Sequence, residues 1–272
     1  IFVVKFRGAN VRMTNVKLPL TFVCSHERSG THFLMNSLAK NSLYSYGEQL
    51  NFDPLSDALK RLGIDFHHTE QLAQLLVDFE HFVFEGERRY FPSLIKSHFH
   101  AHFMEQFLTG DRRFIYIFRE PKDTLISFWK FLLRYPDQKY KSNPEKFYGK
   151  TITEFFKLSP CGKSARYQRK AFTDYFSRWA DHVNGWIELS ERNSNVILVR
   201  YETLMRDFTP TLNSIFTKFG YEEKKFCKKP NRDDFYPGES IPIVASEIRL
   251  LEHAIREKLK EQPKIVALFG DE

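Results

Sequence analysis

The sequence has no apolar run long enough to span a membrane, and no signal-peptide pattern precedes its first expected strand. It begins at Ile1 rather than at a methionine, which leaves open a leader removed ahead of it. Cysteine is scarce too, with only Cys24, Cys161 and Cys227 in the chain. Their number is odd, their spacing is wide, and they form no CxxC or Cys/His metal pattern. A disulfide framework is therefore not expected, and a reducing compartment, the cytoplasm, is the simpler prediction.

Internal repeats, low-complexity segments and long runs of one charge are also absent. The formal charge is +7, from 41 basic and 34 acidic residues spread along the chain. This distribution favours an anionic small ligand as readily as nucleic acid, and we predict no nucleic-acid partner. A chain of 272 residues that is 42% hydrophobic can bury one large core or two smaller ones. We predict a single domain over residues 1–272.

Residues 20–38, LTFVCSHERSGTHFLMNSL, predict a buried strand that enters a helix through a tight loop. The first N–H groups of such a helix are unpaired, and the helix dipole favours negative charge beside them. Gly30 lets the backbone close on an anion, while Ser29 and Thr31 offer hydroxyl groups. Arg28 adds a permanent fork of donors. The loop predicts a phosphate or sulfate site, or else an ordinary strand-to-helix turn with a threonine cap.

The string SLIKSH, residues 93–98, predicts a short buried strand with polar groups at its carboxyl end. Ligands of open α/β sheets lie beyond the carboxyl ends of the strands, so Lys96 and His98 stand where chemistry is expected. If the chain stayed extended, His98, His100 and His102 would share one side and could bind a metal. No carboxylate or cysteine pattern supports that metal site, so a catalytic imidazole at His98 is preferred.

Residues 113–118, RFIYIF, predict another buried strand, and Arg119 follows directly after it. Asp123 can cap the next helix, which carries Ser127 one turn further along. Arg119 and Ser127 therefore bracket a second helix N-terminus. Together with the first loop, this arrangement implies a ligand with phosphate groups at two separated points. The alternative is a plain surface ion pair of Arg119 with Glu120 or Asp123.

Hydrophobic spacing predicts the remaining elements, and polar, Pro- and Gly-containing stretches separate them. We expect an edge strand within residues 1–13, helices at 55–62, 69–84, 172–191, 208–219 and 245–260, and a strand at 195–201. In the helix at 172–191, Trp179, Val183 and Trp186 fall on one face and are predicted to pack in the core. The polar stretch 139–170 is interpreted as a mobile lid or a plain surface loop.

Five strings in this order, HERSGTHF, IKSH, YIFREPKDTLISFWKF, HVNGW and ILVRYETLMRDF, resemble the cytosolic-type sulfotransferases. This family uses 3′-phosphoadenosine 5′-phosphosulfate (PAPS), and the strings span Leu20 to about Phe219. The resemblance implies an α/β domain with a central parallel sheet flanked by helices and a P-loop-like phosphosulfate-binding strand, loop and helix. It also implies transfer of a sulfuryl group from PAPS to a hydroxyl or amine, which gives PAP and a sulfated product.

The same resemblance implies roles for individual residues. The phosphosulfate group would be held by Arg28, Ser29, Gly30, Thr31 and His32. Arg119 and Ser127 would take the 3′-phosphate, with Phe33 and Tyr201 beside the nucleotide. His98 matches the catalytic base and Lys96 a neighbouring catalytic lysine, and Arg28 would also act on the transferring group.

Three departures from the family pattern are visible. The loop usually reads Lys-Ser-Gly-Thr-Thr-Trp, whereas here Arg28 replaces the lysine and His32 offers a ring nitrogen in place of the second threonine. The Arg-Lys-Gly motif for the 3′-phosphate is not visible, and residues 228–229 or 231–232 are candidate substitutes. The C-terminal dimerisation string is absent as well, so we expect a monomer or a weak homodimer.

The chemistry can be argued from the residues themselves. Sulfuryl transfer needs donors where charge builds on the leaving phosphate and a base where the acceptor loses its proton. Arg28, Lys96 and the loop N–H groups can supply the donors, and His98 can supply the base. Because the cations are side chains, we expect no metal.

Two other classes of protein compete with this interpretation. A small-molecule kinase would carry Gly-x-x-x-x-Gly-Lys-Ser/Thr, which is missing around Gly30. A non-catalytic protein that binds a nucleotide or another polyanion could use the same scaffold.

The acceptor is expected to be a small molecule or carbohydrate that bears a hydroxyl group. Several aromatic and imidazole side chains lie near the expected site in sequence and could line an apolar pocket. These residues are Phe99, His100, Phe103, Phe131 and Tyr135. They are compatible with an aromatic or aliphatic alcohol, and a carbohydrate or a carrier-bound hydroxyl is the alternative.

Overall fold

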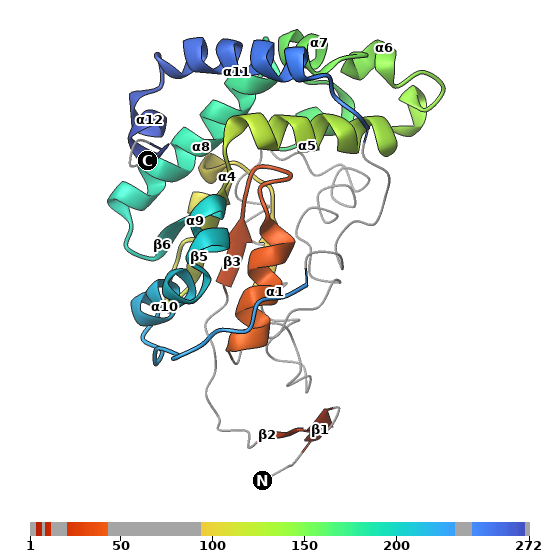
Figure 1. Ribbon diagram of the computed structural model, residues 1–272. Coiled ribbons are helices and arrows are strands. Elements are labelled where there is room, and N and C mark those ends of the chain that lie inside the picture. Colours follow the sequence, from red (N-terminus) through yellow and green to blue (C-terminus); the bar gives the residue numbers. More distant parts are fainter. Residues whose placement is uncertain (1–3, 7–8, 12–20, 43–93, 232–240, 270–272) are drawn as a thin grey trace, which may run out of the picture.

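A computed structural model describes residues 4–6, 9–11, 21–42, 94–231 and 241–269 of the chain (Figure 1). Its centre is a parallel sheet in the order β4-β3-β5-β6. The strands are β3 (Thr21–Cys24), β4 (Leu94–Ser97), β5 (Arg113–Phe118) and β6 (Val196–Arg200). In this register Cys24 lies opposite both Ser97 and Tyr116. The carboxyl ends of β3 and β4 therefore meet at one edge of the sheet, which is where the polar strand-end residues were expected.

The sheet is buried on both faces, as an all-parallel sheet requires. Side chains alternate along each strand, so Phe22 and Tyr116 enter one hydrophobic core while Val23 and Ile115 enter the other. The second core is completed by α1 (Thr31–Asn41), α9 (Tyr201–Arg206) and α10 (Phe208–Lys218). This layering confirms the predicted α/β fold with a parallel sheet flanked by helices.

The first core is larger and more aromatic. The elements around it are α4 (Ala101–Met104), η1 (Glu105–Phe107), α5 (Pro121–Arg134), η2 (Gln138–Tyr140), α6 (Glu145–Tyr148), α7 (Ile152–Lys157), η3 (Gly162–Ala165), α8 (Tyr175–Arg192), α11 (Ala245–Leu259) and α12 (Pro263–Phe269). Figure 1 shows α11 running alongside α5, with α8 beneath them. Trp179, Val183 and Trp186 of α8 are fully buried, which confirms the predicted core face. Large aromatic side chains bury roughly 150–250 Å² each, so these positions contribute much of the apolar burial.

The stretch 139–170 is not a plain surface loop. It contains α6 and α7, and Tyr148, Ile152 and Phe155 are fully buried against the first core. The ring of Phe155 stacks on Tyr175 with 3.8 Å between centroids. The prediction failed because the apolar residues of this stretch are spread between prolines and charges, which conceals their common face.

Three local predictions also need correction or lie outside the described residues. The expected N-terminal edge strand is an antiparallel pair, β1 (Val4–Phe6) with β2 (Ala9–Val11), which is separate from the parallel sheet. Helix α5 begins at Pro121, so Asp123 lies inside its first turn and does not cap it. The helices predicted at 55–62 and 69–84 fall outside the described residues.

Candidate active site at the carboxyl ends of β3, β4 and β5

The loop between β3 and α1 holds two residues with left-handed backbones. Gly30 is the N-cap of α1 with φ of 99°, and Arg28 has φ of 70°. No side chain caps α1, and the first helical hydrogen bond runs from the Leu34 N–H to the Gly30 carbonyl over 3.1 Å. Thr31 does not act as the cap, because its hydroxyl contacts Ser25 Oγ instead. The helix N-terminus therefore keeps its positive end without a side-chain cap, as an anion site requires.

Gly30 permits a close approach that no other residue would allow. A Cβ at this position would lie 2.7 Å from Cε2 of Tyr201, the first residue of α9. The Tyr201 ring in turn packs against the Phe33 ring, with 6.2 Å between the two centroids. The Arg119 guanidinium lies over the Tyr201 ring, 4.9 Å from the centroid of that ring. Three residues predicted to hold the nucleotide, Gly30, Phe33 and Arg119, therefore lie around the ring of a fourth, Tyr201.

Arg28 connects the loop to α5. Its Nε donates a hydrogen bond to Ser127 Oγ over 3.2 Å, and its guanidinium lies 5.2 Å from the centroid of Phe131. The Lys163 ammonium lies 4.8 Å from the same ring. Two cations from distant parts of the chain therefore flank one aromatic side chain of α5.

Arg119 forms the ion pair that the alternative interpretation predicted. Its Nη2 donates to Asp123 Oδ2 over 3.0 Å, four residues along the chain. Its Nε, however, is buried and has no hydrogen-bond partner among the described residues. The Ser29 hydroxyl is buried in the same way without a partner. Buried polar atoms are nearly always paired, so these two orphaned groups suit a polar ligand.

His98 is held so that its tautomer is defined. Its Nδ1 lies 3.0 Å from the carbonyl oxygen of Ser25 and 3.2 Å from Ser25 Oγ. Because a carbonyl can only accept, Nδ1 carries the proton and Nε2 carries the lone pair. Burial lowers the pKa of His98 well below its usual value, and the nearby Lys96 charge lowers it further. The imidazole is therefore neutral at pH 7.

His32 lies in the same electrostatic environment. Burial lowers its pKa to about 4, and Lys96 and Arg28 contribute in the same direction. His32 can thus offer a neutral ring N–H at pH 7, although it adds no charge. The structure therefore brings together the four predicted polar residues Arg28, His32, Lys96 and His98.

A second layer of buried polar residues lies beneath the loop, and the sequence analysis did not identify it. Arg178 of α8 donates from Nη2 to both carboxylate oxygens of Glu27, over 2.7 and 2.9 Å. Its Nη1 donates to His26 Nε2 over 2.6 Å, and His26 Nδ1 donates to the Glu27 carbonyl over 3.0 Å. All three side chains are buried.

His182, one turn along α8, extends this layer toward His98. Its Nε2 donates to the His98 carbonyl over 3.1 Å, and its Nδ1 accepts from the Tyr116 hydroxyl over 2.9 Å. The i, i+4, i+7 spacing of Arg178, His182 and Gly185 is the sequence signal that could have placed them on the buried face of the helix.

Most of the residues expected to line an acceptor pocket are packed in the core, exposed to solvent or engaged in structural hydrogen bonds. Phe99 and Phe103 are part of the first core, and Tyr135 is 46% exposed. His100 accepts from the His102 N–H over 3.0 Å as the N-cap of α4, and donates from Nε2 to the Asp181 carbonyl over 3.0 Å. Sequence proximity was a poor guide because the chain turns sharply at this point.

That turn also removes the geometry on which the histidine metal site depended. Helix α4 begins at Ala101, so His98, His100 and His102 do not continue along an extended strand. Within the described ranges, no group of three His, Cys, Asp or Glu side chains is arranged to hold a metal ion. The residue that does pack near His98 is Tyr167, whose ring lies 5.8 Å from the imidazole.

One of the candidate substitutes for the missing Arg-Lys-Gly motif lies near the nucleotide side. Lys229 Nζ lies 5.6 Å from the centroid of Phe208, which packs on Phe33 with 6.1 Å between centroids. The Lys228 backbone is instead bonded to Asn41, at the far end of α1. Asn231 is exposed, and Arg232 lies outside the described residues.

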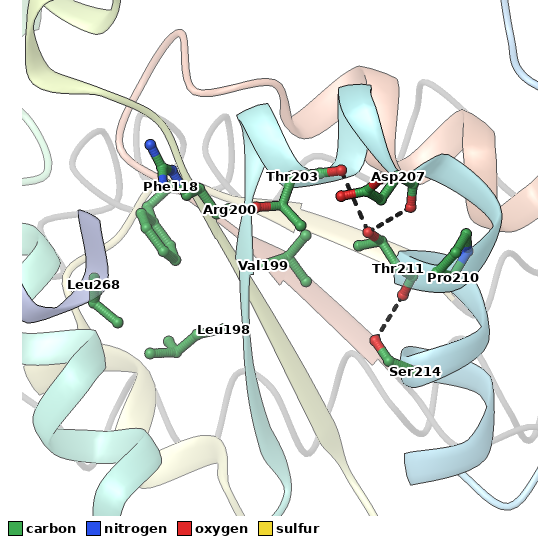
Figure 2. A pocket seen from close by; sticks show the side chains of 10 residues that line it. All are labelled: Phe118, Leu198, Val199, Arg200, Thr203, Asp207, Pro210, Thr211, Ser214 and Leu268. Carbon is green, nitrogen blue, oxygen red and sulfur yellow. Dashed lines mark hydrogen bonds between the residues drawn. The ribbon is translucent and has the colours of Figure 1, made fainter. Parts of the chain in front are cut away.

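A hollow of about 490 Å³ lies elsewhere, beside the edge strand β6 (Figure 2). Its lining residues are Phe118, Leu198, Val199, Arg200, Thr203, Asp207, Pro210, Thr211, Ser214 and Leu268. The hydroxyls of Thr211 and Ser214 are used in local helix bonds, to the Asp207 and Thr211 carbonyls over 2.7 and 2.8 Å. None of the predicted site residues lines this hollow, so it is separate from the site described above.

No helix in the described part of the chain has both the length and the apolar character needed to cross a bilayer.

The family model described as "Sulfotransferase domain" matches residues 18–233. Human Sulfotransferase 2A1 is 29% identical over 128 residues, which cover 46% of this chain and 37% of that protein. Cytosolic sulfotransferase 17 of Arabidopsis thaliana is 26% identical over 207 residues, which cover 74% of this chain and 51% of that protein. The chain thus spans about half or less of the length of these curated relatives.

Among solved structures, the crystal structure of mouse sulfotransferase SULT7A1 complexed with PAP is similar to this chain with a TM-score of 0.44. The two are 21% identical, and the match covers 75% of this chain and 59% of the mouse protein.

Proposed function

Because this chain belongs to the sulfotransferase-domain family, we propose that it transfers a sulfuryl group from PAPS to a hydroxyl or amine of an acceptor. The products would be PAP and the sulfated acceptor. The observation that carries the proposal is the meeting of Arg28, His32, Lys96 and His98 beside the N-terminus of α1, which no side chain caps.

The described residues fit a doubly anionic nucleotide at two places. The loop offers the orphaned Ser29 hydroxyl, the Arg28 guanidinium and the first N–H groups of α1 to one phosphate group. The second phosphate group would meet the unpartnered Nε of Arg119 and the hydroxyl of Ser127. Phe33 and Tyr201 form an aromatic surface between these two ends, suited to a purine.

PAPS supplies a sulfuryl group whose bond to a phosphate oxygen breaks as the acceptor oxygen or nitrogen bonds to sulfur. Arg28, Lys96 and the loop N–H groups stabilise the charge that develops on the leaving phosphate. One such preorganised donor is typically worth about 2.7–4 kcal/mol. His98 accepts the acceptor's proton at Nε2, because hydrogen bonding to the Ser25 carbonyl fixes the proton of Nδ1.

The acceptor is proposed to be a small molecule or a carbohydrate with a reactive hydroxyl or amine. Tyr167 beside His98 supports an apolar or aromatic wall on this side of the site. We also propose that the protein acts in a reducing compartment, the cytoplasm. The three cysteines support this, because Cys24, Cys161 and Cys227 are all free thiols.

Two measurements test the proposed function. Calorimetry should show tight binding of PAP and little or no binding of ATP, with or without Mg²⁺. Preferential ATP binding would instead indicate a kinase. Incubation with radiolabelled PAPS and a panel of alcohols, phenols, amines and sugars should then yield a labelled product. PAP binding without transfer to any acceptor would indicate a non-catalytic nucleotide-binding protein.

A further inference from the structure

The loop that receives the phosphosulfate group in the proposed function contains a buried negative charge. Glu27 directly precedes Arg28, and its side chain is only 10% exposed. A carboxylate at this position is unfavourable for an anion site, because two like charges in a buried region repel each other strongly. Some feature of the fold must therefore cancel the charge of Glu27.

Arg178 is placed to do this. Its side chain is 1% exposed, and it donates to both oxygens of Glu27 from the helix beneath the loop. The neighbouring His26 brings no charge, since burial and the Arg178 guanidinium lower its pKa well below the usual value. The side chains of Glu27 and Arg28 alone would give the loop a charge of zero. With Arg178 the sum becomes +1.

We propose that Arg178 is a positioning and charge-compensating residue for the phosphosulfate loop, which it keeps net positive by neutralising Glu27. This inference rests on the proposed function. It assigns Arg178 no contact with the substrate, because both terminal nitrogens of its guanidinium are hydrogen-bonded to His26 and Glu27.

The details of the pair favour this role over simple stabilisation of the fold. Arg178 Nε is buried without a partner among the described residues, so the network is incomplete and costs stability. Buried ion pairs can often be replaced by apolar side chains without loss of stability. The position of the pair supports a functional role as well, because Glu27 directly precedes Arg28 and Ser29 of the loop. The compensating charge of Arg178 thus contacts the loop itself.

The test compares PAP binding by the full chain and by three variants, Arg178→Met, Glu27→Gln and the double variant. Arg178→Met leaves the carboxylate unpaired, and it should bind PAP at least about tenfold more weakly than the parent. Glu27→Gln removes the negative charge and should bind within about threefold of the parent or more tightly. The double variant should recover parental affinity to within about threefold, because neither charge remains.

Arg192→Met is the matched control, since its ion pair with Glu105 is on the surface, with side chains 58% and 43% exposed. It should bind PAP like the parent. Thermal unfolding of each variant checks that folded proteins are compared. If Arg178→Met does not fold, Arg178→Gln takes its place, because it also leaves Glu27 without a compensating charge while keeping a hydrogen-bond donor.

The inference is overturned if the double variant binds PAP at least about tenfold more weakly than the parent, since Arg178 would then be needed for itself. Parental affinity in a folded Arg178→Met variant would overturn it equally. Failure of the parent to bind PAP is a different result, which rejects the proposed function itself.

Discussion

Arg28 and Ser127 are 99 residues apart in the sequence, yet a hydrogen bond of 3.2 Å joins Arg28 Nε to Ser127 Oγ. The loop after β3 and the helix after β5 are therefore in direct contact. Residues of the two predicted anion sites are therefore neighbours in the fold, with Tyr201 in contact with both Gly30 and Arg119.

This contact places Arg28 at the centre of the proposed transfer. Replacing it by glutamine removes the charge and the fork of donors while keeping some hydrogen-bonding capacity. We expect kcat/KM for PAPS to fall by roughly a hundred- to a thousandfold, the usual effect of losing one preorganised donor. Steady-state kinetics would measure the change. Arg134→Gln, on the exposed end of α5, is the control and should leave kcat/KM unchanged; a similar loss in both variants would argue against the role of Arg28.

His98→Ala should separate chemistry from binding. The variant lacks the base, so turnover should fall by about a hundred- to ten-thousandfold, while the Kd for PAP should stay within about threefold. His102→Ala changes an exposed histidine nearby and should retain parental turnover. If His98→Ala turned over within a few fold of the parent, another group would have to be the base.

Arg119→Ala tests the assignment of the second phosphate site. Loss of a charge-assisted hydrogen bond typically costs about 1.5–3 kcal/mol, so PAP should bind roughly ten- to a hundredfold more weakly. Adenosine 5′-phosphate, which lacks the 3′-phosphate, should lose far less affinity. Calorimetry with both nucleotides provides the comparison, and equal losses would mean that Arg119 serves only its ion pair with Asp123.

The buried histidines predict how stability depends on pH. Burial lowers the pKa of His26, His98 and His182 well below the usual value, so these residues are neutral in the folded state. In the unfolded chain they take up protons below about pH 6.5, so the unfolded state then binds more protons than the folded state. The free energy of unfolding should therefore fall as the pH drops below about 6.5, by up to about 1.4 kcal/mol per pH unit for each histidine.

Urea unfolding at pH 7.5, 6.5 and 5.5 would measure this effect. The replacement of His182 by glutamine should make the slope between pH 6.5 and 5.5 shallower, because one of the histidines with a lowered pKa is gone. A slope that did not change would mean that His182 is not neutral in the folded protein.

The sequence predicts element boundaries well wherever a continuous apolar run is compatible with only one kind of element. The strand at 113–118 has the observed boundaries, because RFIYIF is buried on both faces of a parallel sheet and reads as a continuous run. Phe208 begins α10 as predicted, and the helix ends one residue earlier, before Gly220. The polar residues at the carboxyl ends of these strands could be predicted for the same reason, since parallel strands end at a common edge.

Other features could not be read from local pattern. Glu27 and Arg178 are 151 residues apart, and charged side chains are normally predicted to be exposed, so nothing in either stretch indicates that they pair in the interior. The start of α5 is different, because the sequence does indicate it through Pro121. Proline is favoured at the first position of a helix, and Pro121 therefore marks its start better than Asp123 does.

Gly185 allows α8 to approach the His100 side chain closely. A Cβ there would lie 2.6 Å from Nε2 of His100, so the imidazole occupies the space that any other side chain at this position would need. Any other residue at position 185 would displace the His100 ring, which caps α4. The helix that carries Arg178 and His182 therefore packs closely on the start of α4 through a residue that contributes no functional group of its own.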